Sequence, residues 1–211
     1  MSKIDRLSGC RDWIDLSFVE RERTPRQLME VGIRLHLADL SLSNTVQEME
    51  KFGVDRSQKV VHDWVHKCDL QPAVDKEPNH VALDETVIQL DEYRYWLYTT
   101  VDPQTNNILH IWLYPTTTTA LTERFLRELT EKHNLDDAMV LVDGAKHLQT
   151  ALRQAGLRFR YEKHGNRNSA ERISRDIKRR TSSFSNCFSH AKPSTAESWL
   201  HAFAVWHNAT N

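Results

Sequence analysis

Three acidic residues stand in sequence contexts that could bring their carboxylates together for metal-dependent chemistry. Asp84 follows a run of apolar residues, Asp143 follows another short apolar run, and Glu171 lies at the start of a helical pattern. Carboxylates that converge on divalent cations allow phosphodiester transfer, because the cations activate the attacking oxygen and stabilise the leaving one. Mg²⁺ prefers such oxygen ligands and keeps several waters, so three acidic side chains suffice.

Each of these residues also has an ordinary structural interpretation. A carboxylate inside an apolar strand is costly to bury unless it is paired or binds metal, which favours a functional role for Asp84. Strand alternation points Glu85 to the opposite face, so it is the poorer candidate. Asp143 precedes a glycine and could be a turn or cap residue, and Glu171 could close a capping box with Asn168. A site therefore requires a fold that brings the three carboxylates together.

The pattern of apolar residues predicts the elements that would position these side chains. A period of two or a short apolar run indicates strands over 81–90, 93–101, 108–114, 138–142 and 157–162. Helical spacing indicates helices over 117–132, 146–154, 168–180 and 195–206. This is the element order of an RNase H-like α/β domain, a mixed five-stranded sheet flanked by helices. In that fold Asp84 on the first strand, Asp143 after the fourth and Glu171 after the fifth are neighbours.

The patterning changes character near residue 70, which predicts a division into domains. Residues 1–24 form an N-terminal segment, and residues 25–69 are helical in period. Residues 70–80 hold two prolines among charged residues and are predicted to be a linker. Residues 81–211 then form the α/β domain.

The helical region before the linker has the pattern of a DNA-binding unit. Asn44 and Gln47 have the spacing of a capping box that would open a short helix, which ends at Gly53. A second short helix follows at once, and the pair is typical of a helix-turn-helix, with an ordinary helical hairpin as the alternative. The start of the second helix offers side chains that could contact phosphates or base edges: Arg56, Ser57, Gln58, Lys59 and His62.

Positive charge gathers beside the third acidic residue, although the formal net charge of the chain is only -1. Glu171, Arg175 and Lys178 fall on one face of the predicted helix. Basic groups beside a carboxylate site suit a DNA backbone, whereas a solvated face with salt bridges between neighbouring turns is the alternative. The candidate DNA-binding residues of this region are Arg167, Arg175, Lys178, Arg179 and Arg180.

Hydropathy and cysteine content narrow the protein class. No apolar run approaches the roughly 20 residues needed to cross a bilayer, and the first residues lack a signal-peptide core. These features predict a cytoplasmic protein that does not engage membranes. Cys10, Cys68 and Cys187 are widely spaced, so neither a disulfide framework nor a structural zinc site is suggested.

Three motifs in combination resemble those of DDE insertion-sequence transposases. They are Val-Ala-Leu-Asp-Glu-Thr at 81–86, Leu-Val-Asp-Gly-Ala at 141–145, and Gly-Asn-Arg-Asn-Ser-Ala-Glu-Arg at 165–172 followed by Ile-Lys-Arg-Arg-Thr at 177–181. The resemblance extends over nearly the whole chain and is greatest to insertion-sequence family six in its short archaeal form. Ser174 departs from the pattern, because a large apolar residue is expected there.

The resemblance implies a helix-turn-helix that recognises terminal inverted repeats, joined to a catalytic domain of the retroviral-integrase type. Asp84, Asp143 and Glu171 would be the ligands of two Mg²⁺ ions, with Mn²⁺ as a substitute, and Lys178 would contact DNA. The implied reaction cleaves double-stranded DNA at the element's ends, and the exposed 3′-hydroxyls then attack target DNA. A homodimer or higher oligomer on DNA is expected.

Two other functions remain compatible with these residues. A catalytically decayed remnant or regulator would bind terminal repeats without cutting them. A plain RNase H-like nuclease would hydrolyse nucleic acid without joining strands. Assays of strand cleavage and strand joining separate the three.

Overall fold

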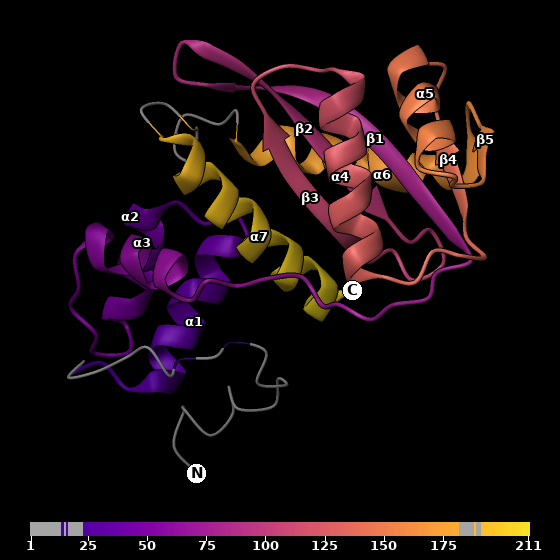
Figure 1. Ribbon diagram of the computed structural model, residues 1–211. Coiled ribbons are helices and arrows are strands. Elements are labelled where there is room, and N and C mark those ends of the chain that lie inside the picture. The colour runs from indigo at the N-terminus through magenta and orange to yellow at the C-terminus, as the bar shows by residue number, and fades with distance from the viewer. Residues whose placement is uncertain (1–13, 15, 17–22, 182–187, 189–190) are drawn as a thin grey trace.

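A computed structural model describes residues 14, 16, 23–181, 188 and 191–211 (Figure 1). Most of the predicted N-terminal segment 1–24, together with Cys10 and Cys187, lies outside these residues, and Cys68 is buried. No helix in the described part of the chain is long and apolar enough to cross a membrane. The elements are α1 Arg26–Leu37, α2 Leu42–Glu50, α3 Gln58–Lys67, β1 His80–Leu90, β2 Tyr93–Val101, β3 Ile108–Tyr114, α4 Thr119–Lys132, β4 Met139–Val142, α5 Lys146–Gln154, β5 Phe159–Tyr161, the 3₁₀ helix η1 Gly165–Arg167, α6 Asn168–Thr181 and α7 Pro193–Thr210.

The strands form one mixed sheet in the order β3-β2-β1-β4-β5. β1 pairs antiparallel with β2, and β2 pairs antiparallel with β3. β4 is parallel to β1, and β5 is parallel to β4. An antiparallel meander of three strands followed by two parallel strands, with helices between them, is the RNase H-like topology that the element order predicts.

Alternation along β1 decides which side chains reach each face of the sheet. Val81 and Leu83 are fully buried against α4 and α5, in one of two hydrophobic clusters. Ala82 lies in the other cluster, with α6 and α7. Asp84 follows Ala82 on that second face and contacts side chains of η1 and α6. The sheet therefore separates two layers of helices, and the first acidic residue faces α6.

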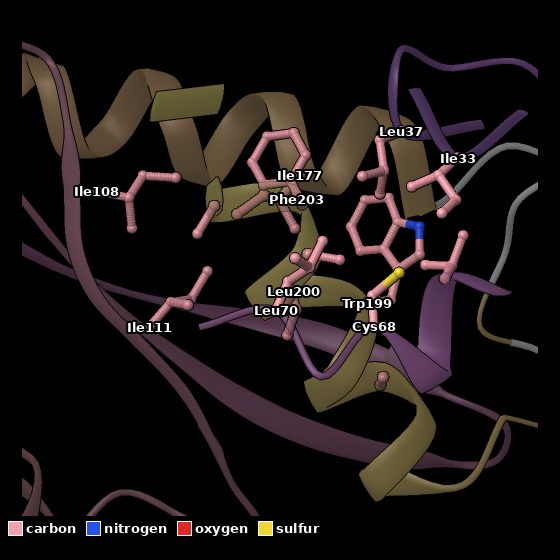
Figure 2. Close-up of a cluster of buried hydrophobic side chains, with 14 of the residues drawn as sticks. Ile33, Leu37, Cys68, Leu70, Ile108, Ile111, Ile177, Trp199, Leu200 and Phe203 are labelled. Carbon is pink, nitrogen blue, oxygen red and sulfur yellow. The ribbon is translucent and has the colours of Figure 1, made fainter. Parts of the chain in front are cut away.

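The three-helix unit formed by α1, α2 and α3 packs against α7 instead of standing apart from the sheet domain. Figure 1 shows α7 lying between this unit and the sheet. Figure 2 shows Ile33 and Leu37 of α1 in one buried cluster with Trp199 of α7, Ile177 of α6 and Ile111 of β3. Because one hydrophobic cluster spans both parts, separating them would expose apolar surface to water.

The connection between the two parts is also held by backbone hydrogen bonds. Asp75 donates its backbone N–H to the carbonyl of Lys132 at 2.8 Å, and Asn134 donates to the carbonyl of Lys76 at 3.0 Å. The predicted linker 70–80 thus lies along the end of α4.

The start of α2 differs from the sequence prediction. Ser41 is the N-cap, and its hydroxyl accepts a hydrogen bond from the backbone N–H of Asn44 at 3.1 Å. Asn44 and Gln47 therefore lie inside the helix, and the predicted capping box there is wrong. A serine side chain is short enough for its hydroxyl to reach the backbone N–H three residues further along. Ser41 therefore caps a helix that starts three residues before the predicted start.

The polar end of α7 is bonded to the edge of the sheet. Asn208 accepts a hydrogen bond from the N–H of Ile108 at 2.7 Å and donates one to the carbonyl of the same residue at 2.9 Å. Asn211 donates to the carbonyl of Asn106 at 3.0 Å. β3 is an edge strand, and Asn208 pairs backbone groups that an edge leaves open.

A buried and a half-buried histidine, His36 and His66, make the three-helix unit sensitive to acid. Burial, followed by the nearby charges of His62 and His36, lowers the pKa of His66 to about 4. Burial also lowers the pKa of His36. An unfolded histidine titrates near 6.5, so between pH 6.5 and 4 the unfolded chain binds more protons than the folded one. The free energy of unfolding therefore falls as the pH drops through this window.

We expect the melting temperature to decrease between pH 7 and pH 5, by about 2–4 °C for each kcal/mol lost in a protein of this size. Replacement His66→Gln removes one of the titrating groups and is expected to flatten the decrease. Thermal melts of both proteins at a series of pH values measure this. Parallel curves would show that His66 does not contribute.

Candidate functional site

Two of the three predicted acidic residues are brought together by the parallel pairing of β1 with β4. In that register Ala82 lies opposite Leu141. Continuing the register by two residues places Asp84 opposite Asp143, which directly follows the end of β4. The carboxyl end of β4 therefore meets the middle of β1 at the point where both acidic side chains stand.

The third acidic residue reaches the same place from α6, through an arginine. The Arg167 guanidinium lies 3.0 Å from Oδ1 of Asp84 and 3.6 Å from Oδ2 of Asp143 through its Nη2 atom. Its Nη1 atom donates to Oε1 of Glu171, one helical turn further along. All three carboxylates thus lie within ion-pair distance of one guanidinium.

Ser174 completes the surroundings of the first carboxylate. Its hydroxyl donates to Oδ2 of Asp84 at 2.7 Å, and the serine is only 4% exposed. A large apolar residue, which the family pattern predicts there, could not make this bond. Arg167, Glu171 and Ser174 are spaced by four and three residues, so one face of the η1–α6 segment turns toward β1.

Burial is unequal within this acidic cluster, which we define as Asp84, Asp143 and Glu171. Asp84 is 8% exposed, and its burial raises the pKa of the carboxyl despite the Ser174 bond and the Arg167 charge. The negative charges of Glu171 and Asp143 contribute further to this rise. The side chains of Asp143 and Glu171 are 41% and 36% exposed. The cluster is therefore closed at Asp84 and open to solvent at the other two.

Asp143 and Glu171 differ in whether they also have the ordinary structural role of a turn or cap residue. Asp143 Oδ1 accepts a hydrogen bond from the backbone N–H of Ala145 at 2.9 Å, so it is a turn residue as well. Its second oxygen faces Arg167, which leaves both interpretations compatible. Glu171 binds the Arg167 guanidinium, so its carboxylate is directed into the cluster.

The donor set suits a hard divalent cation, because all three groups are carboxylates. In the described ranges, no three Asp, Glu, His or Cys side chains stand close enough together to hold a metal ion. In the acidic cluster, the Arg167 guanidinium lies between the carboxylates. Asp84, Asp143 and Glu171 are the side chains that could supply the ligands of such a divalent cation. The chemistry of these carboxylates therefore fits Mg²⁺, and the Arg167 guanidinium lies among them.

A second polar network supports the opposite side of β1. Glu85 Oε2 lies 2.7 Å from Nε2 of His147, at the start of α5, and accepts a hydrogen bond from Thr117 at 3.3 Å. The Thr117 hydroxyl lies 2.9 Å from the same imidazole nitrogen. Glu85 thus faces away from the acidic cluster, as alternation predicts, and the network ties the start of α5 to β1.

The basic residues predicted on α6 separate into two groups. Arg175, Lys178 and Arg179 are exposed, and Arg179 pairs with Asp39 at 3.0 Å and with Asp176 at 2.8 Å. Arg180 is 7% exposed and donates to the carbonyl of Leu37 in α1 at 2.5 Å.

Arg167 and Arg180 were predicted to contact DNA, but the structure buries both. Arg167 is 6% exposed, within the acidic cluster. Arg180 lies where α6 meets α1, with its guanidinium carbon 4.7 Å from the Trp206 ring centroid. These two guanidinium groups are directed into the protein, whereas the exposed ones follow the outer face of α6.

The residues predicted at the start of α3 lie on the surface of the three-helix unit. Ser57, Gln58 and Lys59 are exposed, and Arg56 and His62 are half-buried. Lys59 pairs with Asp63 on the same helix at 3.0 Å. The side chains predicted to face DNA are therefore accessible.

The decisive comparison is with models of protein families. Residues 79–209 match the model of a DDE domain of the IS240 transposase type. The chain belongs to this DDE transposase family. The matched region runs from β1 into α7 and thus includes the whole acidic cluster. DDE domains are those of metal-dependent polynucleotidyl transferases, which act on DNA in transposition.

A related protein and two solved structures complete the comparison. An uncharacterized protein of Methanocaldococcus jannaschii is 29% identical in an alignment of 198 positions that covers 90% of this chain and 92% of that protein. The magnesium-bound catalytic core of HTLV-2 integrase in its trimeric form is 17% identical, with a TM-score of 0.43, over 61% of this chain and 85% of that one. The catalytic core of BIV integrase is 12% identical, with a TM-score of 0.43, over 60% and 82%.

Proposed function

We propose that this DDE protein is a DNA transposase that cleaves the ends of an insertion sequence and transfers them into target DNA. The observation that supports it most is the convergence of Asp84, Asp143 and Glu171 on one guanidinium. These residues come from a strand, a loop and a helix that lie far apart in the sequence. Three carboxylates that converge repel one another, which costs stability. Binding of a divalent cation would give this costly arrangement a chemical use.

In this proposal the acidic cluster binds Mg²⁺, with two ions expected and Mn²⁺ as a substitute. The ions would activate the attacking oxygen and stabilise the leaving oxygen of the phosphodiester. Asp84 supplies the fixed ligand, since Ser174 and the surrounding strand hold its carboxylate in place. Asp143 and Glu171 supply the ligands on the solvent-exposed side, where a DNA strand can approach.

The proposed DNA path joins the outer face of α6 to the three-helix unit. Arg175, Lys178 and Arg179 follow this face from Glu171 toward α1, and their positive charges suit a phosphate backbone. The three-helix unit would act as a helix-turn-helix, with Ser57, Gln58 and Lys59 at the accessible start of its second short helix. The terminal inverted repeats would be recognised there, with the protein acting as a homodimer or higher oligomer in the cytoplasm.

The proposal is tested with DNA that flanks the protein's own gene, since this should contain the inverted repeats. Labelled duplexes are incubated with the wild-type protein or with Asp143→Asn, in Mg²⁺, Mn²⁺ or EDTA. We expect metal-dependent strand cleavage by the wild type and a loss on the order of a thousandfold in the variant, because one metal ligand is removed. DNA binding should remain, since Asp143 lies outside the proposed DNA-binding face.

The rival functions give different results in the same experiment. Equal inertness of both proteins, with DNA binding intact, would identify a remnant or regulator that no longer cuts. Cleavage without joined products in a plasmid target assay would identify a nuclease. Joined products that require Mg²⁺ and Asp143 support the transposase.

A further inference from the structure

The Arg167 guanidinium occupies the centre of the acidic cluster, and its position has a functional consequence. It contacts Asp84, Asp143 and Glu171 at once, which is the set of oxygens that a divalent cation would share. We propose that Arg167 is a built-in counter-cation, which neutralises the cluster in the metal-free protein and must be displaced when the metal binds. This inference rests on the proposed metal site and adds the event that precedes its loading.

Electrostatics gives the reason for such a residue. Three carboxylates that converge in a partly buried site repel one another, and this repulsion destabilises the folded protein unless a positive charge compensates it. Arg167 supplies that charge from the same segment that carries Glu171. A guanidinium and a divalent cation in one position would in turn repel each other. Occupation by arginine and occupation by metal therefore exclude one another.

In this proposal the guanidinium leaves the acidic cluster without a change of fold. Its backbone is anchored, since Glu162 Oε1 accepts hydrogen bonds from the N–H groups of Asn166 at 2.7 Å and Arg167 at 3.4 Å. The side chain ends beside the partly exposed carboxylates of Asp143 and Glu171, so we expect rotation about its own bonds to carry the guanidinium past them to solvent. Only the side chain needs to move.

The bonding of Arg167 in its present position is also incomplete. Its Nε atom is buried and has no hydrogen-bond partner in the described part of the chain. A buried donor without a partner costs free energy, so this position is less stable than the contacts of the two Nη atoms alone would suggest. This incomplete bonding lowers the free energy needed to displace the guanidinium by a divalent cation.

The test measures metal binding in the absence of DNA, so it does not depend on catalysis. Mn²⁺ binding is followed by the electron paramagnetic resonance signal of free Mn²⁺, and melting temperatures are recorded with and without Mn²⁺. Two variants remove the charge: Arg167→Ala, and Arg167→Met, whose unbranched side chain fills more of the same space. Arg172→Ala is the matched control, because Arg172 is an exposed arginine beside Glu171 with no contact to the cluster among the described interactions.

We expect both Arg167 variants to bind Mn²⁺ more tightly than the wild type, by on the order of tenfold or more. Their melting temperatures without metal should be lower, and the increase on adding Mn²⁺ should be larger. Arg172→Ala should match the wild type in each measurement. If the folded Arg167 variants bind Mn²⁺ with unchanged or weaker affinity, the displacement is wrong.

A second pair of variants separates this inference from the proposed function. Asp143→Asn is introduced into the wild type and into Arg167→Met, and Mn²⁺ binding is measured again. Weaker Mn²⁺ binding in both backgrounds would show that the acidic cluster is the metal site. An unchanged Mn²⁺ affinity in the Arg167 variants would then overturn the displacement and leave the metal site standing. If Asp143→Asn leaves binding unchanged in both, the metal site itself is wrong, and both proposals fail.

Discussion

Replacement Asp84→Asn is expected to reduce metal-dependent strand cleavage by on the order of a thousandfold. Asparagine has nearly the same shape: its one carbonyl oxygen can still accept a hydrogen bond from Arg167, and its amide NH2 can donate to the Ser174 hydroxyl, which then accepts where it donated before. It lacks the negative charge that holds a divalent cation, so the fixed ligand of the proposed metal site is lost. The large effect should therefore come from chemistry and not from a disturbed strand.

Thermal stability provides the control for this interpretation. Burial raises the pKa of the Asp84 carboxyl, which means that the folded protein disfavours the charge that the substitution removes. We therefore expect little change in the melting temperature of Asp84→Asn. Glu92→Gln makes a similar chemical change in the exposed turn between β1 and β2 and should leave cleavage unaltered. Cleavage close to the wild-type rate in Asp84→Asn would contradict the assignment.

The second large effect is expected on stability, from Arg180→Ala. This side chain donates to the Leu37 carbonyl at 2.5 Å and to Asp176 at 3.0 Å, and it stacks over Phe203 and Trp206. Its removal leaves a buried carbonyl without this donor and takes a cation from two aromatic faces. We expect a loss of about 2–4 kcal/mol in the free energy of unfolding, or roughly 5–15 °C in melting temperature.

Arg179→Ala is the matched control, because the two arginines are adjacent and of the same type. Arg179 is exposed, and its ion pairs with Asp39 and Asp176 are solvated and contribute little. Urea unfolding of both variants measures the difference. Equal losses in Arg179→Ala and Arg180→Ala would show that Arg180 does not join α6 to the three-helix unit and α7.

The α/β part of the fold was predictable because its elements follow strong local patterns. The three strands of the meander alternate or run apolar over most of their length, and β1 to β3 begin and end within a residue of the prediction. Boundaries were less predictable where a single polar residue decides them. Ser41 is the N-cap of α2, and Pro193 begins α7 two residues before the predicted helix.

The buried face of α1 shows a limit of sequence periodicity. Leu28, Val31 and Leu35 recur at helical spacing along the sequence. Leu28 is buried, but Ile33 and Leu37 are more completely buried than Val31 and Leu35. A single stripe is expected when a helix packs on one neighbour. α1 packs on α2 and α3 and also against α7, so its buried surface is wider than the pattern indicates.

The acidic cluster was predictable from topology, and its arginine was not. Parallel pairing brings the residue after β4 beside the middle of β1, so the neighbourhood of Asp84 and Asp143 follows from strand order. The bond between Arg167 and Asp84 joins residues 83 positions apart, and no local pattern distinguishes Arg167 from the exposed basic residues around it. Its spacing of four residues from Glu171 was the one available signal. Arg180 was hidden in the same way, because only the packing of α1 and α7 turns it inward.

The shared core of the three-helix unit and α7 fixes the distance between the start of α3 and the acidic cluster. Ile33 and Trp199 lie in one hydrophobic cluster, and backbone hydrogen bonds hold the segment that joins the two parts. In the proposed function, DNA read at the start of α3 would meet the acidic cluster at an interval set by packed side chains. Such a fixed spacing would place every cut at the same number of base pairs from the recognised sequence. A flexible linker would instead allow cuts at varying distances.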